Sequence, residues 1–272
     1  MRDHNGLPLM ASPDPRWFQV CALSVLLLAS MTLYDLAATP LQAAVTIGTA
    51  LAAQALFCAG FGTRFEALSP AITGLSLSIL LRTHEPWLWA AAAGLGIASK
   101  FLLRVEGKHL FNPAAFGIVV LLAVDAEVWV SPGQWGTAVW LVAALVCAGA
   151  LVLSRARRAG TAAAFLGCYG GLIGGRAWWL GDPWTIPLHQ VQTGSLLLFA
   201  CFMITDPRST PDHPAARLVF AMAVAGGAYW LQFVWQVRTG AYWALAGAAV
   251  LTPLLDAVLP AARFRWRSLG VQ

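Results

Sequence analysis

The sequence has few charged residues and lacks the signatures of most enzyme classes. Only 11% of its 272 residues are charged, whereas 59% are hydrophobic, which is outside the range of a soluble globular domain. It contains no HExxH, Walker or nucleophile-elbow pattern, which argues against a metalloprotease, an NTPase or a serine hydrolase. Apolar runs fill almost the whole length, so there is no room for a soluble domain with its own core. We therefore predict an integral membrane protein.

Cysteine and histidine are also sparse and scattered. None of the five cysteines forms a CxxC pair, and all lie inside apolar runs, where they are predicted to be small buried side chains. The five histidines include no pair at helical spacing, which disfavours a bis-histidine haem within one helix. The net charge of +5 is spread among loops, so we predict no nucleic-acid partner. Because the metal-binding and catalytic patterns are missing, we predict no metal site and no catalytic group.

The apolar stretches predict an all-α fold. Seven stretches are long enough to cross a bilayer at 1.5 Å per residue, and three are shorter. We expect about ten transmembrane segments in all, some of them short or broken. The first is expected to be a retained helix rather than a signal peptide. The long stretches are 17–34, 40–61, 86–104, 133–153, 160–180, 214–234 and 240–259, and the short ones are 67–81, 113–124 and 193–205.

The distribution of the basic residues tests this assignment of membrane segments. Ten crossings place Arg82, Arg176 and Arg238 on one face of the membrane and the other 14 of the 17 lysines and arginines on the opposite face. Because cytoplasmic loops carry an excess of lysine and arginine, this asymmetry predicts a multi-pass protein with both termini in the cytoplasm. Membrane lipid is then its surrounding partner, in the inner membrane of the cell.

The short segments belong to a repeat. Thr73-Gly74 and Thr193-Gly194 lie 120 residues apart, and each opens a short apolar run that is followed by a long span and a proline-containing run. Duplicated units with short or interrupted helices in matching places indicate broken helices that meet at a site within the membrane. The fold is therefore predicted to consist of two repeats.

Asn112-Pro113 stands at the start of one short run, KHLFNPAAFG. Proline is favoured in the first turn of a helix and asparagine is a good N-cap, so both suit an ordinary helix start. The free N–H groups at such a terminus would also favour an anionic or carbonyl-bearing ligand. Both interpretations remain open from the sequence.

Three stretches resemble the RnfD/NqrB family, which comprises membrane subunits of the Rnf and Na⁺-pumping NADH:quinone oxidoreductase complexes. They are LSPAITGLSLSILLRTHEPWLW, KHLFNPAAFGIVVLL and TGSLLLFACFMITDPRSTPDHPAARLVFAMAVAGGAYW. The resemblance covers about residues 65–260, and the TDP-x-S/T-x-P block with a following arginine is its most specific part. Residues 1–64 match only in hydropathy, as two N-terminal transmembrane helices, and residues 261–272 form a basic cytoplasmic tail.

The resemblance implies a bundle of ten helices in two repeats that binds flavin and passes electrons across the membrane, coupled to ion translocation. It also implies other redox or Rnf-like subunits as partners. Since the sequence contains no nicotinamide-binding fingerprint, we expect a redox subunit rather than a self-sufficient enzyme.

The sequence departs from the family at the flavin attachment site. The family esterifies FMN to the threonine of an S-G-A-T motif, and this motif falls on Thr193, Gly194, Ser195 and Leu196. Leucine has no hydroxyl group to esterify, which excludes covalent FMN at position 196. Ser195 or Thr193 could replace the threonine only by a shift of register. We therefore expect a noncovalent flavin, FMN or riboflavin.

Two groups of residues are the candidate flavin site. One is expected near the cytoplasmic face and consists of Lys108, His109 and Asn112 together with Asp206, Ser209 and Arg217. The other, Thr193, Gly194 and Ser195, is expected at the outer end. Asp206 would equally serve as a cap for the helix after its turn.

Asp256 is the candidate for an ion path, because an acid in an apolar run is costly without a partner. Pairing with Arg263 or Arg265 would explain it equally well. The loss of the attachment threonine also leaves an alternative function open: a channel or transporter for a small solute or for flavin, built on the same two-repeat fold.

Overall fold

The computed structural model describes residues 14–32, 38–124, 127–132 and 139–264. Within them the chain is an all-α membrane protein with four short strands. The helices of the first half are α1 (Pro15–Thr32), α2 (Pro40–Gly60), α3 (Leu68–Leu80), α4 (Pro86–Leu102) and α5 (Pro113–Ala123). Those of the second half are α6 (Val139–Ala156), α7 (Ala159–Leu180), α8 (Thr185–Val191), α9 (Gly194–Leu198), the π-helix η1 (Phe199–Met203), α10 (Pro214–Phe233), α11 (Gly240–Ala249) and α12 (Thr252–Val258).

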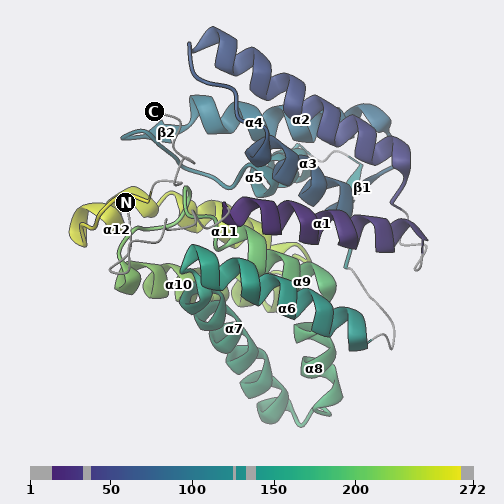
Figure 1. Ribbon diagram of the computed structural model, residues 1–272. Helices are drawn as coiled ribbons and strands as arrows, with labels where there is room; N and C mark the ends of the chain where they lie inside the picture. Colours follow the sequence, from purple (N-terminus) through teal and green to yellow (C-terminus); the bar gives the residue numbers. More distant parts are fainter. Residues whose placement is uncertain (1–13, 33–37, 125–126, 133–138, 265–272) are drawn as a thin grey trace, which may run out of the picture.

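The strands form two small antiparallel pairs. Strand β1 (Leu81–Thr83) pairs with β4 (Val128–Val130), and β2 (Arg104–Val105) pairs with β3 (Lys108–His109) in a hairpin. The turn of this hairpin is Glu106-Gly107, and both residues have positive φ, 50° and 81°, as a tight two-residue turn requires. The two pairs lie at opposite ends of the bundle, which we name the hairpin end and the β1–β4 end (Figure 1).

The two halves pack in the same way, which confirms the predicted repeats. Helix α4 packs on α2 and α5, and α10 packs on α7 and α11. In the same positions, α1 packs on α3 whereas α6 packs on α9 and η1. The halves meet through equivalent helices, because α1 contacts α6 and α5 contacts α11 (Figure 1).

Small residues allow this close packing. A Cβ on Gly96 of α4 would overlap the carbonyl oxygen of Pro113 in α5, and one on Gly240 of α11 would lie 3.0 Å from the carbonyl oxygen of Ala228 in α10. Glycine is favoured where transmembrane helices approach this closely. Larger side chains fill the buried space around these contacts, among them Phe165, Phe199 and Leu77.

Each predicted apolar segment coincides with a helix, although residues 133–138 lie outside the described part. By length and composition, three described helices could cross a membrane, α1, α2 and α10, or five spans if each bent pair counts as one. The bent pairs are α8 with Gly194–Met203 and α11 with α12, and each turns by 47°. The sequence did not predict α8, the strands or the π-helix. The bend in the last predicted span lies just before Pro253, which cannot donate to the preceding turn.

Candidate functional site

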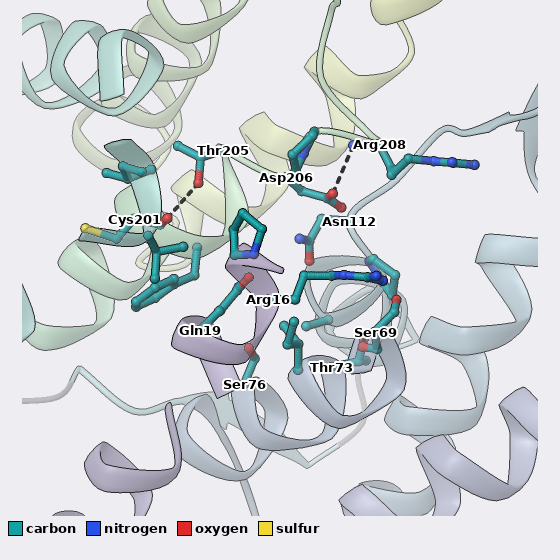
Figure 2. A pocket seen from close by; sticks show the side chains of 18 of the residues that line it. Arg16, Gln19, Ser69, Thr73, Ser76, Asn112, Cys201, Thr205, Asp206 and Arg208 are labelled. Carbon is teal, nitrogen blue, oxygen red and sulfur yellow. Dashed lines mark hydrogen bonds between the residues drawn. The ribbon is translucent and has the colours of Figure 1, made fainter. Parts of the chain in front are cut away.

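Cavities lie at both ends of the bundle, and the two main candidate sites are one cavity at each end. The first, which we name the hairpin-end cavity, has a volume of about 80 Å³ and is surrounded by α3, the start of α5, the start of α1 and the loop 204–213. Figure 2 shows Ser69, Thr73 and Ser76 of α3 on one side of it and Asp206 with Arg208 on the other.

Asn112 forms part of the wall of this cavity. It caps α5, because its Oδ1 accepts a hydrogen bond from the N–H of Ala115 at 3.1 Å, and Pro113 follows in the first turn. The predicted cap is therefore confirmed. The Nδ2 of the same side chain lies 3.5 Å from the carbonyl oxygen of Met203 in η1, so Asn112 also bridges the two repeats.

Asp206 forms a turn and contacts His109 rather than capping a helix. Its Oδ2 lies 3.3 Å from Nε2 of His109, and its Oδ1 accepts the N–H of Arg208 at 3.0 Å. Burial by itself raises the pKa of the Asp206 carboxyl, but the hydrogen bond and charge of His109, with the N–H of Arg208, hold that pKa below its ordinary value. The cap of α10 is instead His213, whose Nδ1 accepts the N–H of Ala215.

Lys108 is the centre of a second set of contacts at the hairpin end. Its Nζ lies 2.8 Å from Oδ2 of Asp256 and 3.2 Å from Oδ2 of Asp212. The backbone N–H of Asp212 donates to Asp256 at 2.8 Å, and Arg217 donates to the carbonyl oxygen of Asp212 at 2.8 Å. This set of contacts, the Lys108 clasp, ties the hairpin of the first repeat to α12 and α10 of the second. A cavity of about 210 Å³ lies beside it.

Asp256 is therefore paired, but not with the predicted arginines. Its partner is Lys108, whereas Arg263 pairs with Glu106 at the hairpin turn. Arg265 lies outside the described residues. The last described residue, Phe264, donates its N–H to Asp212 at 3.2 Å, and its ring centre lies 5.5 Å from the Arg158 guanidinium.

The structure brings the first predicted group together only in part. His109, Asn112 and Asp206 line the hairpin-end cavity, and Lys108 lines the neighbouring one. Ser209 is buried, and its carbonyl oxygen accepts the hydroxyl of Thr252, which anchors the loop to α12. Arg217 lies against Asp212 and does not line the hairpin-end cavity.

The second cavity, which we name the aromatic pocket, lies at the β1–β4 end and has a volume of about 390 Å³. Four aromatic side chains line it: Trp129, Tyr169, Phe199 and Tyr242. Phe199 contacts the ring of Tyr242 at 5.5 Å in an edge-to-face arrangement, and both are buried. Tyr169 donates its hydroxyl to Oε1 of Gln232 at 2.6 Å, which fixes one wall.

The predicted outer residues lie at this pocket. Thr193 and Ser195 line it, and Gly194 is buried at the start of α9. Leu196, at the position of the family's attachment threonine, lines it as well and presents only carbon atoms.

Several lining residues were missed by the sequence interpretation. Trp129, Tyr169, Gln232 and Tyr242 come from four separate elements with no shared spacing, so no pattern connects them. Arg238 entered the sequence interpretation only through the membrane topology, although Arg238 and Thr239 both line the pocket.

Lys100 is a further residue that the sequence interpretation did not place in a site. Its Nζ donates to Oε1 of Gln54 at 3.0 Å and to Oγ of Ser69 at 2.9 Å, and Ser69 lines the hairpin-end cavity. In the first repeat, Lys100 of α4 contacts Gln54 of α2, and in the second repeat Gln232 of α10 contacts Tyr169 of α7 in the same way. The two repeats therefore carry equivalent polar contacts at opposite ends of the bundle.

Comparison with known proteins relates these features to a family. The NQR2, RnfD, RnfE family matches residues 127–265, which include every residue that lines the aromatic pocket. An ion-translocating oxidoreductase complex subunit of Alcanivorax borkumensis is 26% identical over 255 residues, covering 70% of this chain and 72% of that protein. The subunit of the same name from Ectopseudomonas mendocina is 28% identical over 252 residues, covering 71% and 72%.

Proposed function

This chain belongs to the NQR2, RnfD, RnfE family, and from that premise we propose that it is a membrane subunit of an Rnf-type electron transport system. Its relatives are named as subunits of an ion-translocating oxidoreductase complex, which supports other redox subunits as partners. In this proposal it passes electrons through a noncovalently bound flavin, and the transfer is coupled to ion translocation.

The aromatic pocket is the observation that carries the flavin part of the proposal. Its volume of about 390 Å³ falls in the range of about 300–1,000 Å³ that is typical of ligand sites. The walls are aromatic, and the Tyr242 hydroxyl is buried without a hydrogen-bond partner among the described residues. An unpaired hydroxyl in an aromatic pocket suits a flat ring system with carbonyl and N–H groups.

The residues of the pocket have distinct parts in this proposal. Tyr169, Phe199 and Trp129 would hold the ring between flat apolar surfaces, while Gln190 and the Tyr242 hydroxyl would offer hydrogen bonds. A bound flavin would supply the one- and two-electron chemistry that these side chains lack. Because Leu196 has no hydroxyl, the ring would be held by contacts alone.

The hairpin-end cavity is the weaker place for a flavin. Its volume of about 80 Å³ lies well below the range of ligand sites. Two of its polar side chains are already engaged, since Asp206 binds His109 and Asn112 binds the backbone of α5. A flavin there would need the cavity to widen. The contacts around His109, like the Lys108 clasp, are better suited to holding the two repeats together.

The proposed location is the inner membrane of the cell, with the hairpin end in the cytoplasm. The described ends of the chain both lie at the hairpin end, because Pro15 lines its cavity and Phe264 binds Asp212. The excess of lysine and arginine predicted for one face belongs to this end.

An absorption spectrum of the detergent-purified protein, before and after acid precipitation, tests the proposal. We expect flavin bands whose pigment passes into the supernatant. Pigment that stays in the pellet would mean that Ser195 or Thr193 carries it covalently. A colourless protein that has kept its fold would contradict electron transfer through flavin and favour the channel or transporter.

Two variants locate the pigment. Tyr169→Leu removes one wall of the aromatic pocket and its contact with Gln232, so we expect it to reduce the bound flavin strongly. Asn112→Ala is the matched variant at the hairpin end and should leave the flavin content unchanged. The reverse result would assign the flavin to the hairpin-end cavity.

A further inference from the structure

Tryptophan side chains gather on the surface of the second repeat at the β1–β4 end. Trp178 and Trp179, near the end of α7, have exposed fractions of 75% and 81%, and Trp184, just before α8, is 60% exposed. Two further exposed tryptophans, Trp230 and Trp235, lie near the end of α10, which packs on α7. An exposed aromatic surface of this size marks a place that a protein or a lipid covers.

Charged side chains lie among these tryptophans. Arg176 pairs with Asp182 at 3.5 Å, with side-chain exposures of 36% and 34%, and the Arg176 guanidinium lies 4.8 Å from the ring centre of Phe233. Charged groups are costly inside the hydrocarbon core of a bilayer. At its boundary, by contrast, tryptophan rings meet the acyl chains with one side and the polar headgroups with the other. The mixture of tryptophan and charge therefore favours the headgroup layer as the partner of this surface.

The length of α10 places the boundary at the same level. This helix is one of those long and apolar enough to cross a membrane, and its 20 residues extend about 30 Å, the thickness of the hydrocarbon core. Arg217 lies in its first turn and Trp230 near its end. The contact of Arg176 with Phe233 brings the end of α7 beside the end of α10, so Trp178 lies close to the level of Trp230.

Helix α8 follows directly and lies in a suitable direction. Ile186 and Leu188 are exposed, Pro187 is buried, and the ring of Trp184 lies against α7, where a Cβ on Gly174 would be 3.5 Å from it. The helix turns by 47° from the helical segment that follows, and it runs across the direction of α1 and α6 (Figure 1). A short helix with exposed apolar side chains that lies across the bundle suits the plane of the membrane surface.

We propose that residues 178–188 form a tryptophan anchor in the lipid headgroup layer, with α8 lying along the membrane surface rather than forming one broken span with α9 and η1. The inference depends on the membrane location of the chain and not on its flavin. Gln190 and Thr193 come just after the anchor and line the aromatic pocket. The tryptophan anchor would therefore hold one wall of this pocket at the level of the headgroups.

Fluorine NMR of the full chain, labelled with fluorotryptophan and placed in phosphatidylcholine nanodiscs, tests this inference. The variants Trp178→Phe, Trp179→Phe and Trp184→Phe assign the three anchor resonances, because each variant loses one of them. Three paramagnetic probes are then compared: a lipid labelled at the headgroup, a lipid labelled deep in the acyl chain, and a water-soluble gadolinium chelate. We expect the headgroup label to broaden the three anchor resonances most strongly.

Trp89 is the matched control, since it is only 8% exposed in α4, and the headgroup label should broaden its resonance less than those of the tryptophan anchor. Strongest broadening by the deep label would place α8 in a broken span, and broadening by the chelate alone would place it in water. Weak broadening by all three probes would mean that a second copy of the chain covers the segment. Each of these results overturns the inference, whereas a colourless sample with the expected broadening contradicts only the flavin proposal.

Discussion

The hairpin-end cavity and the aromatic pocket occupy equivalent places in the two repeats, but they differ in how their polar groups are satisfied. At the hairpin end, Asn112 caps α5 and Asp206 pairs with His109. At the β1–β4 end, Thr239 leaves α11 without a side-chain cap, and Arg238 and the Tyr242 hydroxyl lack described partners. A site whose groups bind one another stabilises the fold, whereas a site with unpaired groups is prepared for a ligand.

The largest expected effect comes from breaking the Lys108 clasp. Lys108→Met leaves the carboxylates of Asp212 and Asp256 without their cation, so we expect the free energy of unfolding to fall by about 2 kcal/mol. The loss stays below that of a fully buried pair because Asp256 is partly exposed. A thermal melt of the purified protein measures it.

The control for this melt is Arg263→Met. Its pair with Glu106 is exposed, with side-chain exposures of 54% and 75%, so the variant should lose less than about 1 kcal/mol. Equal losses in the two variants would show that the Lys108 clasp is no stronger than a surface ion pair.

The two helix starts give a matched pair of smaller effects. Asn112→Ala removes the cap of α5 and should lower the free energy of unfolding by about 1 kcal/mol. Thr239→Ala removes a side chain that makes no capping bond, so the unliganded protein should melt nearly as the wild type does. If both variants have the same melting temperature, the side-chain cap of α5 does not contribute measurably to the stability of the protein.

The smallest expected effect separates stability from binding at the aromatic pocket. Tyr242→Phe removes the unpaired hydroxyl, so the ligand-free protein should be unchanged or more stable, by up to about 1 kcal/mol. Flavin affinity should fall in the same variant. A loss of stability without flavin would mean that the hydroxyl has a structural partner, such as a bound water molecule.

The helices and the repeat could be predicted from the sequence because they depend on local patterns. Long apolar runs predicted where the helices lie, and Asn112-Pro113 predicted the start of α5. The role of Asp206 was open between a cap and a binding group. Aspartate is common in turns of any protein, so the residue type alone did not decide between the two roles. The residue that precedes Pro214 is His213, and this residue caps α10.

The partners of charged side chains could not be predicted in the same way. The sequence left Asp256 open between an ion path and a pairing with Arg263 or Arg265, but its partner Lys108 lies 148 residues away. The hairpin turn at Glu106-Gly107 and the packing of α4 on α5 bring Lys108 to that place. Both are properties of the assembled bundle.

Local information in the chain was enough to specify an all-α membrane protein of two repeats, because apolar length and spacing fix where helices form in a bilayer. It was also enough to show that position 196 offers no hydroxyl. Which polar groups remain unpaired became clear only in three dimensions. That depends on which side chains from distant helices reach one another, as Lys108 reaches Asp256 and no described group reaches Arg238.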